Sequence, residues 1–131
     1  MGFQDETLMM YCDERDMSIR LDNLGYKELV LKDAVAWHQH VNRPGTTGRS
    51  LFAPFYSSRN RIYLVHKHST PFRAYIAAFK TISFASLLIL YHLLNNRIRA
   101  IDSDRAVICG TYYGLRGKMN VYPNWLRVKS S

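Results

Sequence analysis

The feature that most constrains this chain is an apolar stretch at residues 72–94. Arg73, Lys80 and His92 interrupt it, and its longest uncharged part, TISFASLLILY, is shorter than the roughly 20 residues that a helix needs to cross a bilayer. We therefore expect a helix that either lies in a membrane interface or packs as a buried helix.

Local signals predict where this helix and the one before it begin. Thr70 followed by Pro71 is a capping residue with proline at the first helical position, so the apolar helix should start there. Ser50 can cap an earlier helix that runs to about His66.

A last helix is expected after the apolar stretch. The string Asp102-Ser103-Asp104 offers three residues that can cap it, and Gly114 or Gly117 would end it. The tail beyond these glycines is expected to fray.

The amino-terminal part mixes helix and strand signals. At residues 13–24 apolar side chains recur at helical spacing, and Gly25 follows where a left-handed cap would lie. KELVL at residues 27–31 and AVAW at residues 34–37 are short, apolar and partly β-branched. We expect these two segments to be short strands.

The charge of the chain favours contact with polyanions. Lys and Arg total 18 against 10 Asp and Glu, a formal net charge of +8, which suits nucleic acid, anionic lipid or phosphate-bearing small molecules. Cys12 and Cys109 form no CxxC pair, which favours a reduced, cytoplasmic setting. The acidic amino-terminal residues argue against a signal peptide.

The densest group of reactive side chains is YCDERDMSIRLDNLGY at residues 11–26. Asp13 and Glu14 would lie at the start of a helix, where the positive end of the dipole stabilises carboxylates. Asp16 is spaced to pair with Arg20 one turn later. A capped and salt-bridged helix explains this much without any enzyme.

The same string resembles the acceptor-side motif of family 2 glycosyltransferases of the rhamnosyl- or galactofuranosyltransferase kind. In that motif an aromatic residue precedes two acids, a spacer, an Asp, an apolar residue, an Arg four places after the Asp, and Gly-Tyr. The matching residues here are Tyr11, Asp13, Glu14, Arg15, Asp16, Met17, Arg20, Gly25 and Tyr26. AVAWH at residues 34–38 and FYSSRNRIYL at residues 55–64 resemble the family's next strand and helix, in the expected order.

The resemblance implies catalytic roles for the acidic residues. Glu14 holds the position of the base that takes the proton of the acceptor hydroxyl during inverting transfer. Asp13 would orient Glu14, and Asp16 with Arg20 would fix the helix beside the site. Many relatives have Asp where this chain has Glu14, so the longer side chain is a departure from the pattern.

The resemblance also implies contacts with a nucleotide sugar and a saccharide acceptor. His38 matches a ligand of the divalent metal, Mn or Mg, that holds the diphosphate in some relatives. Trp37, Arg20, Arg59 and Asn60 are expected to bind substrate, and the guanidinium of Arg59 is suited to a diphosphate.

In fold, the resemblance implies an α/β fragment. Residues 1–50 would be the acceptor-side part of a GT-A-like domain, with a helix and two short strands, and residues 51–131 a mostly α-helical, basic extension. A complete transferase needs roughly twice this length, because a sugar-nucleotide domain precedes the acceptor half. Asp102-Ser103-Asp104 comes too late to be the family's Asp-x-Asp motif. The chain is thus expected to be a carboxyl-terminal portion that is inactive alone.

Two other functions stay open. A small membrane-associated protein without catalysis, built on residues 72–94 and their basic flanks, is compatible with the main prediction, because relatives that modify lipid-linked sugars work at the cytoplasmic membrane face. The same residues could mediate self-association. A nucleic-acid-binding module is less favoured, because neither a zinc-finger spacing nor an aromatic RNA-binding motif is present.

Overall fold

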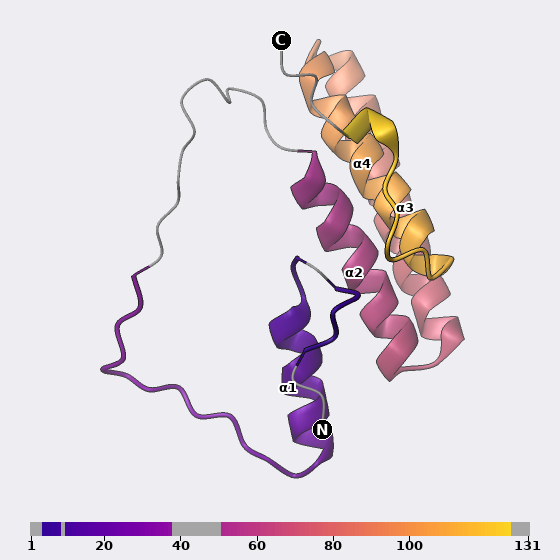
Figure 1. Ribbon diagram of the computed structural model, residues 1–131. Helices are drawn as coiled ribbons and strands as arrows, with labels where there is room; N and C mark the ends of the chain where they lie inside the picture. Colours follow the sequence, from indigo (N-terminus) through magenta and orange to yellow (C-terminus); the bar gives the residue numbers. More distant parts are fainter. Residues whose placement is uncertain (1–3, 9, 38–50, 127–131) are drawn as a thin grey trace.

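The computed structural model describes residues 4–8, 10–37 and 51–126 of the chain. These residues form four α-helices and a short 3₁₀-helix. In chain order they are α1 (Asp13–Asn23), α2 (Phe52–His68), α3 (Pro71–Leu94), α4 (Ile98–Leu115) and η1 (Asn124–Leu126). Figure 1 shows α2, α3 and α4 side by side, running alternately up and down, with α1 against one end of α2.

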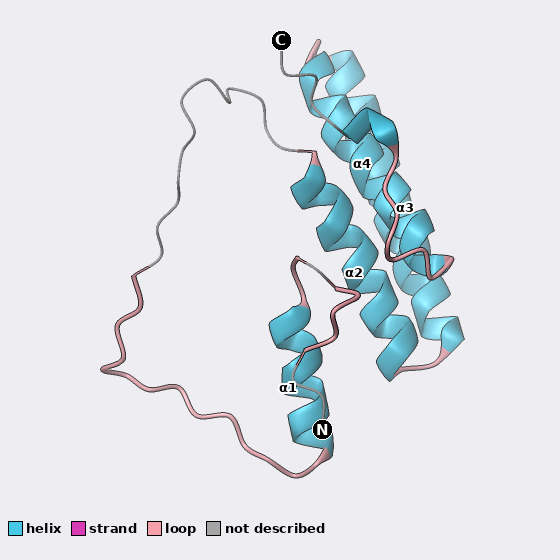
Figure 2. Cartoon of the chain, viewed as in Figure 1, coloured by secondary structure: helices cyan, strands magenta, loops and turns pink. Residues whose placement is uncertain are grey.

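The prediction of an α/β fragment is wrong. The described residues contain helices and no strand, and the segment at 27–37 runs as an irregular loop away from the bundle (Figure 2). Leu29 and Val30 in the first expected strand are 85% and 97% exposed. A strand must pair its backbone N–H and C=O groups with a neighbouring strand. The described part of the chain supplies no such neighbour, so the apolar pattern alone does not produce a sheet.

The predicted start of α3 is confirmed. Thr70 has extended backbone angles, its Oγ1 accepts a hydrogen bond from the backbone N–H of Arg73 at 3.4 Å, and Pro71 occupies the first turn. Proline costs nothing there because its missing N–H would have no partner inside the helix.

The predicted cap of α1 is confirmed as well. Gly25 has φ +83°, and its N–H donates to the carbonyl of Asp22 at 2.9 Å. The next N–H, of Tyr26, donates to the carbonyl of Leu21 at 3.0 Å. This pair of bonds is the Schellman arrangement, which satisfies the last carbonyls of the helix.

The predicted cap of α4 is wrong, because α4 begins at Ile98 and the Asp102-Ser103-Asp104 string lies inside it. Asp104 is buried, and its Oδ2 lies 2.7 Å from Nδ1 of His92 on α3. The tail after α4 was expected to fray, but Met119 and Leu126 in it are buried; residues 127–131 lie outside the described residues. Tertiary packing, which local signals do not report, decides both outcomes.

Glycines on α4 allow it to approach α2 closely. A Cβ atom at Gly110 would lie 2.2 Å from the carbonyl oxygen of Phe55, and one at Gly114 would lie 2.4 Å from that of Arg59. Beside this contact lies a core of buried apolar residues from α2, α4 and η1. Its members are Phe55, Tyr56, Ala106 and Leu126.

Replacing Gly114 by Ala should force α4 away from α2, because the new Cβ would overlap backbone that cannot move aside alone. We expect the free energy of unfolding to fall by about 3 kcal/mol, measured by urea denaturation followed by circular dichroism. Gly25→Ala is the control. Its Cβ would have no atom within 4 Å, so only the strain of a left-handed alanine, about 1 kcal/mol, is expected. Equal losses in the two variants would contradict close packing at Gly114.

Candidate functional site

Asn60 on α2 fastens the segment that precedes α1. Its side chain is fully buried, and its Nδ2 lies 2.7 Å from the carbonyl oxygen of Leu8, 2.5 Å from that of Met10 and 2.9 Å from that of Tyr11. The two hydrogens of this amide are shared among the three acceptors. One side chain of α2 therefore sets the path of the chain into α1.

Arg59, the neighbour of Asn60, is buried without a carboxylate partner. Its Nε donates to Oδ1 of Asn60 at 2.9 Å, and its Nη1 donates to the carbonyl of Met119. Its guanidinium lies 4.5 Å from the ring centre of Tyr56. All ten Asp and Glu residues of the chain lie in the described part, and none forms an ion pair with Arg59. Burial lowers the pKa of Arg59, although arginine stays protonated at neutral pH.

Arg59 and Asn60 were predicted to bind substrate, and both are enclosed by protein here. Asn60 orients the segment before α1, and Arg59 fixes the amide of Asn60 through its oxygen. Their position nevertheless joins two pieces of the glycosyltransferase-like pattern that lie far apart in sequence. The Arg-Asn pair of the helix lies directly behind the Tyr11 end of the acidic motif.

The backbone just before α1 is strained. Tyr11 and Cys12 have φ of 65° and 67°, a left-handed conformation that costs non-glycine residues about 1–2 kcal/mol each. The hydrogen bond from Asn60 to the carbonyl of Tyr11 holds this turn in place. Asp13 and Glu14 follow immediately, so the strained turn sets the position of the first two acids of the motif.

An ion-pair network around the buried carboxylate of Asp16 fixes α1 to the end of α2. Asp16 is fully buried and lies 2.9 Å from Nε of Arg20, 2.8 Å from Nζ of Lys67 and 2.7 Å from Nε2 of His68. Nζ of Lys67 also lies 2.7 Å from Asp5. The predicted pairing of Asp16 with Arg20 is thereby confirmed.

The carboxylates of this network stay charged in moderately acidic solution. Burial opposes ionisation of Asp5, yet hydrogen bonds from Lys67 and Thr7 lower its pKa from 3.8 to about 2. Burial likewise opposes ionisation of Asp16, and hydrogen bonds from Lys67 and His68 lower its pKa. The same contacts raise the pKa of Lys67 against its own desolvation.

The three predicted catalytic acids therefore lie in different surroundings. Asp16 is buried in the ion-pair network, Asp13 is half-buried and Glu14 is exposed. Burial raises the pKa of the neighbouring Cys12 thiol, which keeps it protonated at neutral pH. Of the three acids, Glu14 has the side chain that is most open to a ligand in solution.

The remaining predicted site residues are not gathered here. Trp37 is 95% exposed at the end of the irregular segment, and His38 lies outside the described residues. Within the described ranges no group of three His, Cys, Asp or Glu side chains is placed to hold a metal ion. Sequence reasoning missed Asp5, Lys67 and His68, because their spacing to Asp16 carries no motif.

No family model, curated protein or solved structure matches this chain. The resemblance to family 2 glycosyltransferases thus rests on the order of the motifs, and it stays a prediction.

Replacing Asn60 by Ala should release the segment before α1. The variant leaves buried carbonyls and Nε of Arg59 without partners, and we expect the free energy of unfolding to fall by about 3 kcal/mol. Asn95→Ala is the control, since the Asn95 amide is exposed and donates to the carbonyl of Tyr91 one turn earlier on the same helix; the free energy of unfolding should fall by less than about 1 kcal/mol. Urea denaturation measures both, and similar losses would show that Asn60 has no special part.

Acid should weaken the contact between α1 and α2. Because the pKa of Asp5 is lower in the folded chain, its contribution to stability is complete above its ordinary value of 3.8 and is lost as the pH falls toward about 2. The Lys67→Met variant should have a lower free energy of unfolding than the wild type near neutral pH. On acidification its free energy of unfolding should fall by less than that of the wild type.

The matched control for Lys67→Met is Lys27→Met. The Lys27 amine is 85% exposed and lies 3.9 Å from Asp22, so its removal should leave the pH dependence of unfolding unchanged. The measurement is the urea midpoint at a series of pH values. A Lys67→Met profile that parallels the wild type would rule out the network as the cause.

Proposed function

We propose that this chain carries the acceptor-binding, base-supplying region of an inverting sugar transferase. The observation that carries the proposal is the hydrogen bonding of Asn60 to Tyr11, which joins the Arg-Asn pair of α2 to the acidic motif of α1. In the resemblance these two pieces belong to one site. Asn60 and Tyr11 are 49 residues apart in sequence, so neither motif by itself implies this contact, and it supports the proposal.

The chemistry of the proposal falls on Glu14. Its carboxylate takes the proton of an acceptor hydroxyl while that oxygen bonds to the anomeric carbon of a nucleotide sugar. The bond from the anomeric carbon to the diphosphate breaks in the same step, and the nucleoside diphosphate leaves with the electron pair. Attack from the face opposite the leaving group inverts the configuration.

The surroundings of Glu14 suit a base that meets a bulky saccharide. It is exposed in the first turn of α1. The strained turn at Tyr11 and Cys12 fixes the start of this helix, and Asp16 anchors it one turn later. A base held on a rigid element keeps its geometry through the reaction.

The proposal retains a divalent metal, Mn or Mg, as the partner of the donor diphosphate. His38 is the candidate ligand by resemblance alone, and the metal would neutralise charge on the leaving diphosphate. By resemblance Asp13 would orient Glu14, and both lie in the first turn of α1.

The test combines saccharide binding with transfer. The labelled chain should bind a saccharide on a glycan array, and Glu14→Gln should leave this binding unchanged because the amide still forms hydrogen bonds. A complete transferase needs a sugar-nucleotide domain before its acceptor half, so that domain of a family 2 glycosyltransferase is joined to the amino terminus of the chain for the transfer assay. With labelled uridine or thymidine diphosphate hexoses, manganese and that saccharide, Glu14→Gln should lower transfer by about 100-fold or more relative to the same fusion without the substitution.

Asp22→Asn is the matched control, because Asp22 is an exposed carboxylate at the other end of α1. It should bind and transfer like the wild type. A chain that binds no saccharide on the array, or a Glu14→Gln variant that transfers sugar at the wild-type rate, contradicts the proposal.

A further inference from the structure

The helix α3 has its small side chains inside and its large apolar side chains outside. Ala74, Ala78 and Ala85 are buried against the other helices. The opposite side, here called the outer face, is made of large apolar residues that are more than half exposed. Its main members are Phe72, Phe79, Phe84, Leu87, Leu90 and Leu94.

This arrangement leaves α3 without cover in the described structure. Only 11% of its most apolar 18-residue window is buried, and Phe79 and Leu94 are 73% and 76% exposed. Continuous apolar surface of this extent is unusual on a soluble monomer and marks a contact with a membrane or a partner. With 24 residues, α3 is about 36 Å long, so its outer face is about as long as a bilayer is thick.

By length and composition α3 could cross a membrane, but its neighbour prevents this. Nδ1 of His92 on α3 lies 2.7 Å from the buried carboxylate of Asp104 on α4, so the two helices would have to enter together. The first half of α4 also carries Asp102 and Arg105, both exposed. Moving these charges into hydrocarbon is unfavourable. An orientation in the plane of the membrane keeps α4 in water.

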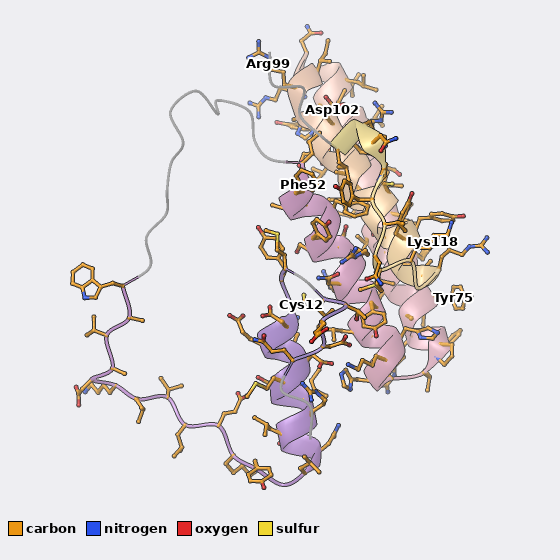
Figure 3. All side chains as sticks on the ribbon, viewed as in Figure 1. Cys12, Phe52, Tyr75, Arg99, Asp102 and Lys118 are labelled. Carbon is orange, nitrogen blue, oxygen red and sulfur yellow. The ribbon has the colours of Figure 1, made fainter. Side chains whose placement is uncertain are left out.

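The charges around α3 favour anionic lipid over a second copy of the chain. The helix has no acidic residue, it carries Arg73 and Lys80, and Arg97 and Arg99 follow its end. Figure 3 shows Tyr75 at one end of the bundle and Arg99 at the other. A symmetric dimer through the outer face would bring like charges together without a counter-ion, whereas anionic headgroups match them.

We propose that α3 binds an anionic phospholipid bilayer and lies in its plane. The outer face enters the acyl region, the basic side chains reach the headgroups, and α2 and α4 remain on the water side. This proposal does not rest on sugar transfer, because none of its residues belongs to the Glu14 region.

The first test is co-sedimentation with vesicles. The chain should bind vesicles of phosphatidylcholine with phosphatidylglycerol. The affinity of the double variant Phe79→Glu, Leu87→Glu for these vesicles should be lower by about tenfold or more. The matched control is Leu29→Glu, Val30→Glu, which makes the same change at exposed apolar residues of the irregular segment. It should bind like the wild type, with circular dichroism showing equal helix content in all three.

The second test measures depth along the helix. In a chain that carries Trp37→Phe and Trp125→Phe, the substitutions Phe72→Trp, Phe84→Trp and Leu94→Trp are made one at a time. The fluorescence of each variant is quenched by lipids brominated at known depths. Equal depth at the three positions supports an in-plane helix, and a steady change from one end to the other shows a spanning helix and overturns the proposal. It is also overturned if the wild type stays in the supernatant, or if the outer face instead forms a dimer that Phe79→Glu, Leu87→Glu dissociates.

Discussion

The amide of Asn60 binds three carbonyl groups of the segment before α1, and this contact decides where α1 lies. A buried polar group without a partner costs about 1–3 kcal/mol, so the segment cannot leave α2 without losing several bonds at once. Arg59 orients the amide by donating to its oxygen at 2.9 Å. The left-handed turn at Tyr11 and Cys12 persists because this buried pair and the Asp16 network hold both of its sides.

Close backbone contact is the other constraint on the bundle. Gly110 and Gly114 bring α4 against α2, and small alanines bring α3 against its neighbours. Small residues inside leave the large apolar side chains of α3 outside. The packing of the helices thus creates an apolar surface on α3. The same packing holds the charged residues of α4 next to α3. For this reason we infer that α3 lies on a membrane surface and does not cross the membrane.

Three predictions from local signals are confirmed, and in each the relevant partners lie within one helical turn. The cap at Thr70, the glycine turn at Gly25 and the pairing of Asp16 with Arg20 were all readable, because each involves one helical turn. The two strands were predicted wrongly, since a strand depends on a distant partner. Asp104 was mistaken for part of a cap because its contact with His92 on α3 has no local signature. For the site, the sequence named Glu14, Asp16 and Asn60 but not their surroundings.

The sequence by itself determined the helical segments at α2 and α3, the acidic motif before Gly25 and the excess of positive charge. Only the tertiary structure decided which acid of the motif is buried, that Asp16 meets Lys67, and which side of α3 is left exposed. The physical reason is range. A helix end satisfies its backbone groups within one turn, whereas burial and ion pairing depend on which distant segments pack together.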